Sequence, residues 1–153
     1  MMKTGPLAGY PVLSLHVTVK HGSYHEVDSS ELAFKLATYK GIKEAFMKAG
    51  PMILEPIMDV EIVCPQEYMG DIIGDISSRR GMIEGQDQRG NAVAILCKVP
   101  LSEMFGYTTT LRSITQGRGT STMKFALYEK VPNSLSEKII AERKGKKGLA
   151  DDE

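Results

Sequence analysis

The stretch MDVEIVCPQEYMGDIIGDI, residues 58–76, decides the fold, because its hydrophobic period changes at a proline. In the first half, apolar residues alternate with Asp59 and Glu61, which is typical of a strand with one face against a core. Pro65 then opens a helix with an apolar stripe at i, i+3, i+4 and i+7, formed by Met69, Ile72, Ile73 and Ile76. This stretch predicts a strand and a helix packed against each other.

A second set of elements repeats this arrangement. Residues 82–85 predict a short strand, residues 87–90 a polar turn, and the apolar run 92–99 a central strand covered on both faces. Pro100 opens a second helix that carries Met104, Phe105, Thr108 and Leu111, and Met123, Phe125 and Leu127 alternate in a final strand. The order strand, helix, strand, strand, helix, strand predicts an α+β, ferredoxin-like βαββαβ domain over residues 51–132, with two helices on one face of an antiparallel sheet.

Residues 1–50 supply too few elements for a domain. Alternating apolar residues predict one strand over 11–20, and a helix is expected to begin at Asp28 or Ser29 and to end at Gly50–Pro51. A lone strand cannot satisfy the backbone groups along its two edges. We therefore expect half of a domain, with this edge either disordered or paired with a neighbouring molecule.

The end of the chain predicts one more helix. Pro132 and Asn133 precede a candidate capping box, Ser134 with Glu137, and the helix is expected over residues 133–145. Glycine and charged residues dominate 146–153, which we expect to be a disordered tail.

Composition limits the function classes. Lysine plus arginine and aspartate plus glutamate number 19 each, so any RNA contact must come from local placement of charge rather than from a basic chain. No apolar run is long enough to cross a bilayer, and the first residues do not form a signal peptide, so a cytoplasmic protein is expected. Cys64 and Cys97 lie in strand-like runs and are expected to be reduced core thiols. No catalytic or metal-ligand spacing is found in the sequence.

Several phrases of the sequence resemble bacterial-type translation elongation factor G. They are residues 5–12 (GPLAGYPV), 22–30 (GSYHEVDSS), 54–58 (LEPIM), 70–75 (GDIIGD), 100–107 (PLSEMFGY) and 111–119 (LRSITQGRG). The resemblance runs from about residue 5 to 143 and implies a C-terminal fragment. Residues 1–50 would be the second half of domain IV, half of a ribosomal-protein-S5-domain-2-like fold. Residues 51–132 would be domain V, and the helix at 133–145 would pack back on domain IV.

The resemblance implies two RNA-binding regions. A tip loop of domain IV would enter the decoding region and contact transfer RNA and messenger RNA through Gly22, Ser23, Tyr24, His25, Glu26 and Asp28. The end of the second helix of domain V would lie near the sarcin–ricin loop of the large ribosomal subunit and present Arg112, Ser113, Gln116 and Arg118. Arginine supplies a planar fork that suits phosphate, and glycine lets a backbone approach RNA closely.

A further candidate is Arg79-Arg80-Gly81 at the end of the first helix, for which RNA contact and a charged helix end weigh about equally. The resemblance also implies contact between this domain and the GTPase-associated RNA. Two glycine-rich runs, residues 117–119 and 145–148, lack the spacing of a phosphate loop, so no GTP site is expected in this chain. GTP and Mg²⁺ would belong to domains of the full-length family, and no cofactor or metal is expected here.

Other interpretations remain open. A recycling-type paralogue would share the fold, and a free-standing ferredoxin-like module could bind ribosomes by itself. An acylphosphatase-like enzyme would need an asparagine beside an arginine, and only Asn91, in a turn, offers one. The interpretation that the sequence favours is a non-catalytic, ribosome-binding part of elongation factor G, the translocation factor.

Overall fold

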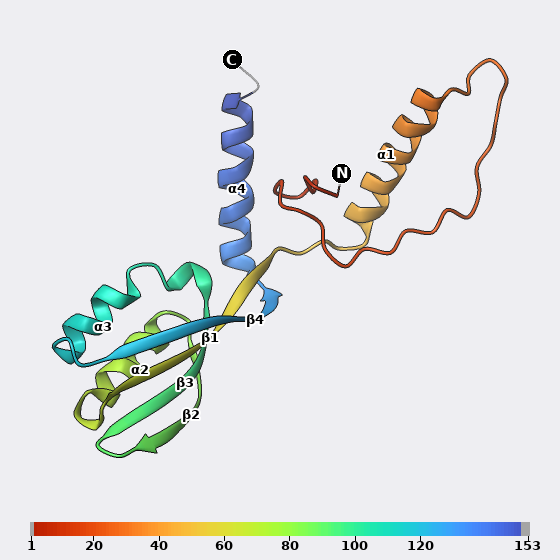
Figure 1. Cartoon of the computed structure of the whole chain (residues 1–153). Coiled ribbons are helices and arrows are strands. Elements are labelled where there is room, and N and C mark those ends of the chain that lie inside the picture. Colours follow the sequence, from red (N-terminus) through yellow and green to blue (C-terminus); the bar gives the residue numbers. More distant parts are fainter. Residues whose placement is uncertain (1, 151–153) are drawn as a thin grey trace. The chain divides into compact units, whose positions relative to one another are not determined.

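The computed structural model describes residues 2–150, with the side chains of residues 2–146. The chain divides into two compact units (Figure 1). One is Leu54–Lys130, and the other joins Met1–Ile53 to Val131–Glu153. None of the helices that the structure describes is long and apolar enough to cross a membrane.

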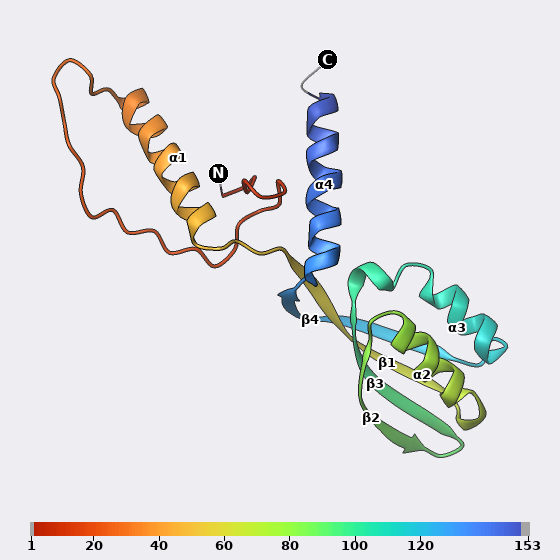
Figure 2. The same ribbon diagram turned by 180° about the vertical axis from the view of Figure 1, so that it is seen from behind.

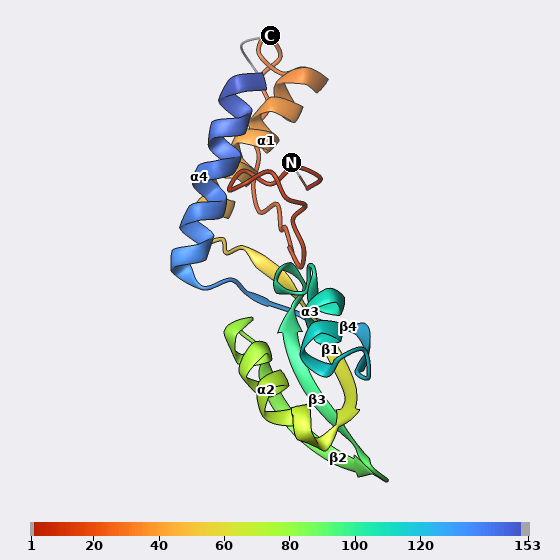
Figure 3. The ribbon, with the colours of Figure 1, turned by 90° about the vertical axis from the view of Figure 1, so that its left-hand side faces the viewer.

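The unit at 54–130 is a four-stranded antiparallel sheet in the order β2-β3-β1-β4 (Figure 2). The strands are β1 (Leu54–Pro65), β2 (Met82–Arg89), β3 (Ala92–Pro100) and β4 (Thr120–Lys130). Helices α2 (Met69–Ser78) and α3 (Tyr107–Thr115) lie side by side over one face of the sheet (Figure 3). This confirms the α+β, ferredoxin-like βαββαβ fold expected from the sequence.

One hydrophobic core lies between the sheet and the two helices. It contains alternate residues of the central strands together with the inner faces of α2 and α3, namely Val60, Ile62, Cys64, Ile72, Ile76, Val93, Ile95, Cys97, Val99, Tyr107 and Leu111. The periods detected over β1, β3 and α2 therefore mark faces that are removed from water, and this burial is the main stabilisation of the unit. The alternating residues of β4 do not join the core, since Met123, Phe125 and Leu127 are 37–53% exposed.

Strand β3 is central, but the prediction that both its faces are covered is wrong. Leu96 on the open face is 40% exposed, and Lys98 on the same face pairs with Asp59 at 3.0 Å and Glu84 at 2.7 Å. Both helices cover the other face, so an apolar run alone did not distinguish a central position in the sheet from burial on both sides.

The second helix begins later than the sequence suggested. Pro100 leads into a short 3-10 turn, Leu101–Glu103, and α3 starts only at Tyr107, after Gly106. Gly106 has φ 74° and ψ 1°, a left-handed conformation that glycine adopts without strain. As a result Tyr107 enters the core and Phe105, expected on the apolar side of this helix, faces solvent.

In the unit that contains residues 1–53, the predicted strand over 11–20 is not formed. No partner strand stands beside it among the described residues, and a lone strand gains no ladder hydrogen bonds. The helix that follows, α1 (Glu31–Lys48), begins after Ser30, whose side chain accepts from the Ala33 N–H, so Asp28 and Ser29 are not its cap. No residue of α1 is buried.

The last helix, α4, spans Asn133–Ala150, longer than the expected 133–145. The tail expected to be disordered therefore begins as helix over 146–150, and its remaining residues lie outside the described part. Extending a formed helix adds one hydrogen bond per residue fixed and needs no new nucleus, which lets α4 run through Gly145 and Gly148. Within this unit the Arg143 guanidinium lies 4.2 Å from the centre of the Tyr10 ring.

The two cysteines are free thiols in the core, as expected. Burial raises the pKa of the Cys97 thiol to about 11 and also raises the pKa of Cys64. The folded state then holds protons that the unfolded thiols release near their ordinary pKa of about 8.5. The contribution of these thiols to the free energy of unfolding is fully present below that pH and is lost as pH rises toward 11.

We therefore expect the melting temperature to fall between about pH 8.5 and 11, and to fall less steeply in Cys97→Ala, since the variant lacks one such thiol. Calorimetry across this range measures both slopes. Identical slopes would contradict the prediction.

Candidate nucleic-acid interface

The C-terminal end of α3 is shaped by a left-handed cap. Gln116 has φ 52° and Gly117 has φ 81°, and the N–H groups of both donate to the carbonyl of Arg112. The buried Thr115 hydroxyl donates to the Leu111 carbonyl at 2.7 Å and accepts from the Gly119 N–H at 2.8 Å. A Cβ on Gly119 would lie only 2.8 Å from two Thr115 side-chain atoms, so glycine is required where the backbone passes the helix.

This cap exposes three of the four predicted side chains on one face of the helix. Arg112, Ser113 and Gln116 follow helical spacing and are all exposed. The guanidinium of Arg112 has no ion-pair or hydrogen-bond partner among the residues with described side chains. It is therefore available to a ligand from outside.

Arg118, the fourth predicted residue, is instead engaged within the domain. Its guanidinium donates to Glu67 at 2.9 Å and to the Tyr68 hydroxyl, and lies 5.0 Å from the centre of the Tyr68 ring. The hydrogen bond to Tyr68, with Glu67 nearby, raises the pKa of Arg118. Part of its charge is thus balanced before any ligand arrives.

The charge around this corner is positive, although the protein has no net charge. Residues 104–119 contain Arg112 and Arg118 and no carboxylate, whereas Arg89 and Lys98 on the sheet are paired with carboxylates. Arg118 is already paired with Glu67, so Arg112 is the cation of this corner that has no carboxylate partner among the residues with described side chains. Cations attract phosphate, and the outer face of α3 is therefore the candidate interface in this unit.

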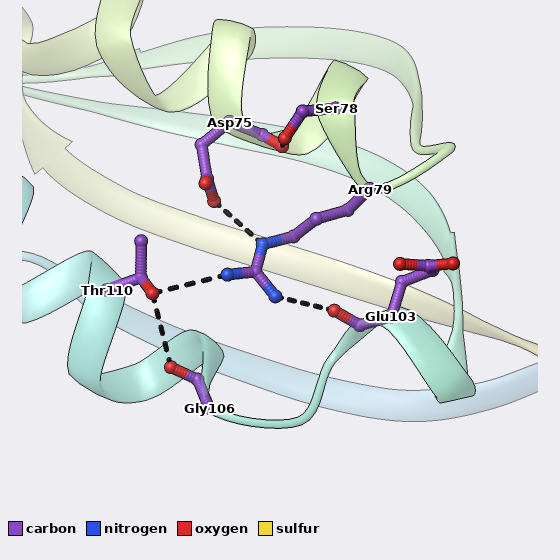
Figure 4. A network of polar contacts seen from close by, with 6 residues as sticks. All are labelled: Asp75, Ser78, Arg79, Glu103, Gly106 and Thr110. Atoms are coloured by element: carbon purple, nitrogen blue, oxygen red, sulfur yellow. Dashed lines mark hydrogen bonds and ion pairs between the residues drawn. The ribbon is translucent and has the colours of Figure 1, made fainter.

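Arg79 and Arg80 belong to the fold rather than to this interface. Arg79 donates to Asp75 at 2.9 Å, to the Glu103 carbonyl at 2.6 Å and to the Thr110 hydroxyl at 3.2 Å (Figure 4). Arg80 makes two hydrogen bonds to Glu55, at 2.8 and 2.9 Å, which raise its pKa. The sequence left two roles for this pair equally weighted, and the contacts favour the structural one.

The second candidate region is the loop before α1. All six predicted residues there, Gly22, Ser23, Tyr24, His25, Glu26 and Asp28, are exposed. The His25 N–H donates to the Ser29 hydroxyl at 2.8 Å and the Ser29 N–H donates to the His25 carbonyl at 2.9 Å. The Tyr24 ring stacks on Phe34 at 6.3 Å between centroids. The loop thus has local order while its polar side chains stay accessible.

Metal binding has no geometric support in the part of the chain that the structure describes, where no cluster of three or more His, Cys, Asp or Glu side chains suits an ion.

The fold and the cationic corner together define an α+β protein built around a ferredoxin-like domain with one carboxylate-free helical face. Comparison with known families is more specific. Residues 52–139 match the model of the elongation factor G C-terminus, and residues 1–50 match that of elongation factor G, domain IV. The chain belongs to the elongation factor G family.

A solved structure supports the same relationship. A crystal structure of a protein from Thermus thermophilus matches this chain with a TM-score of 0.82 and 41% sequence identity. The match covers 94% of this chain and 22% of the Thermus chain. The chain thus spans about a fifth of the length of that protein.

Proposed function

We propose that this chain is the ribosome-contacting, non-catalytic part of an elongation factor that promotes GTP-dependent movement of transfer RNA and messenger RNA. In this proposal the loop at residues 22–30 contacts those RNAs in the decoding region. The α3 face contacts the sarcin–ricin loop, and the same domain approaches the GTPase-associated RNA. GTP and Mg²⁺ act in other domains, no cofactor is bound here, and the site of action is the cytoplasm.

The observation that carries the proposal is the outer face of α3. Arg112 stands exposed beside Ser113 and Gln116, with no carboxylate between residues 104 and 119. Guanidinium, hydroxyl and amide groups are the donors that proteins use on phosphate and sugar oxygens. The acylphosphatase alternative is weaker, because Arg79 and Arg80 are held by Asp75 and Glu55 and are not open to a phosphoryl group.

We expect the chain to co-sediment with ribosomes at low salt and to dissociate steadily as salt rises, since contacts to phosphate release bound counterions. Arg112→Met should weaken binding roughly tenfold and make the salt dependence shallower by about one ion. Lys124→Met removes an exposed cation from the sheet and is the matched control, with unchanged binding expected. Failure of the unaltered chain to bind at low salt would refute the proposal.

The unpaired segment in residues 12–20 supports a secondary part of the proposal, which is self-association through this edge. Among the described residues it has no partner strand, and Leu13, Val17 and Val19 are at least half exposed. Backbone groups without a partner strand and exposed apolar side chains both favour pairing with a second copy of the chain. Sedimentation equilibrium over a concentration series tests this: a strictly monomeric chain would rule it out.

A further inference from the structure

Phe105 is an aromatic residue that the fold does not use. Its side chain is 80% exposed, more than that of any other large apolar residue described between positions 54 and 130, where Met82 follows at 68%. Single exposed apolar residues are common on protein surfaces. Phe105 differs from them in the rigidity of its support and in what stands beside it.

The turn that carries Phe105 is fixed at both ends. The Tyr107 N–H donates to the Met104 carbonyl at 3.1 Å, and Gly106 has the φ and ψ of the third residue of a type II turn, which puts Phe105 at its tip. Arg79 holds the Glu103 carbonyl before the turn. The Thr110 hydroxyl, itself bound by Arg79, donates to the Gly106 carbonyl at 3.3 Å (Figure 4).

Phe105 also continues the candidate interface. Five exposed residues of α3 and its C-terminal cap, namely Thr108, Thr109, Arg112, Ser113 and Gln116, are spaced so that they share one face of the helix, and the exposed Phe105 stands in the turn just before them. We call these six residues the α3 stripe. It has an aromatic ring at one end, hydroxyl groups in the middle, and a guanidinium and an amide toward the other end.

We propose that Phe105 stacks on an unpaired RNA base while the rest of the α3 stripe binds the backbone of the same RNA; this rests on the function proposed above. Structured RNA is recognised at loops whose unstacked bases lie on aromatic side chains, and the neighbouring hydroxyl and guanidinium groups bind phosphate and 2′-hydroxyl. A protein partner fits less well, because the other five residues of the α3 stripe are polar and a single ring is a small hydrophobic contact.

The rigid turn adds to affinity. A ring held in place before binding loses little conformational freedom on contact, so more of the stacking energy appears as binding. The exposure of Phe105 also means that its replacement should leave the fold intact, which makes the inference testable by substitution.

The test uses the full chain and an RNA hairpin with 2-aminopurine in an unpaired purine-rich loop. The unaltered chain and Phe105→Tyr should quench its fluorescence on binding, whereas Phe105→Leu, which keeps an apolar side chain without the ring face, should bind roughly tenfold more weakly. Phe125→Leu, a change to an aromatic 53% exposed on β4, is the control and should bind like the unaltered chain.

The outcomes separate the two proposals. If Phe105→Leu binds and quenches like the unaltered chain while Arg112→Met is weakened, stacking is wrong and the proposed RNA contact stands. Equal binding of a fully paired duplex with the same stem would also overturn stacking. If the unaltered chain binds neither the hairpin nor ribosomes at low salt, both proposals fall.

Discussion

Gly81→Ala is expected to lower the free energy of unfolding of the 54–130 unit by about 3 kcal/mol, since it forces an extra carbon into a filled core. A Cβ at this position would lie 2.4 Å from the Ile76 Cγ2 atom, 2.7 Å from the Ile76 carbonyl oxygen and 3.1 Å from Val99 Cγ2. The carbonyl belongs to the backbone and also accepts from the Gly81 N–H at 2.9 Å. The clash therefore cannot be relieved by rotating one side chain.

Gly74→Ala is the matched control for this prediction. Gly74 is exposed within α2, and a Cβ there would meet no atom within 4 Å. Alanine is favoured over glycine in a helix by up to about 1 kcal/mol, so this variant should be more stable than the parent. Urea unfolding followed by circular dichroism measures both changes, and a Gly81→Ala midpoint equal to or above the parent's would show that the close approach is misplaced.

Arg79→Met is expected to cost about 3 kcal/mol of stability, because a mostly buried charge with several bonded partners is removed from one side of the network only. The Arg79 side chain is 17% exposed and that of Asp75 is 20% exposed. The substitution leaves the Asp75 carboxylate, the Glu103 carbonyl and the Thr110 hydroxyl without this donor.

The unfolding midpoint in urea checks this loss. Arg112→Met is the control, since it removes an exposed arginine without a partner among the residues whose side chains are described, and its stability should change by less than about 0.5 kcal/mol. Asp75→Asn combined with Arg79→Met should cost less than the sum of the two single changes, because both remove the same ion pair. Additive costs would mean that the pair contributes no coupling energy.

Local patterns were sufficient to identify the elements of residues 54–130, but not for residues 11–20, whose alternation forms no strand. The change of period at Pro65 placed β1 and α2, and the second set of elements completed the order of the sheet. The predicted starts of the helices were less accurate. Helix α3 begins at Tyr107 rather than near Pro100, and α1 is capped by Ser30 rather than by Asp28. Cap and turn geometry decides such positions, and several polar or glycine residues nearby satisfy the same pattern.

The candidate interface was only partly predictable. Four arginines lie at or near helix ends in the domain, and residue type and position alone do not rank them, since any of them can sit at a helix terminus or on a phosphate. The family resemblance singled out Arg112 and Arg118 and left Arg79 and Arg80 with two equally weighted roles. In the structure Arg79, Arg80 and Arg118 form ion pairs with carboxylates, whereas Arg112 is exposed. Phe105 was assigned to the core side of a helix, and the left-handed Gly106 turned it outward.

By itself the sequence determined the order of strands and helices in 51–132 and the core-facing residues of β1 and α2, because hydrophobic period is a local property of neighbouring residues. It did not determine which face of β3 is open or that the alternating residues of β4 are exposed. Only the tertiary structure decided which charged and aromatic side chains are left for a partner. That outcome depends on contacts such as Arg80 with Glu55 and Arg118 with Glu67, between residues far apart in the chain. Whether residues 11–20 form a strand depends in the same way on a neighbouring strand, since a β-ladder needs hydrogen bonds from two segments.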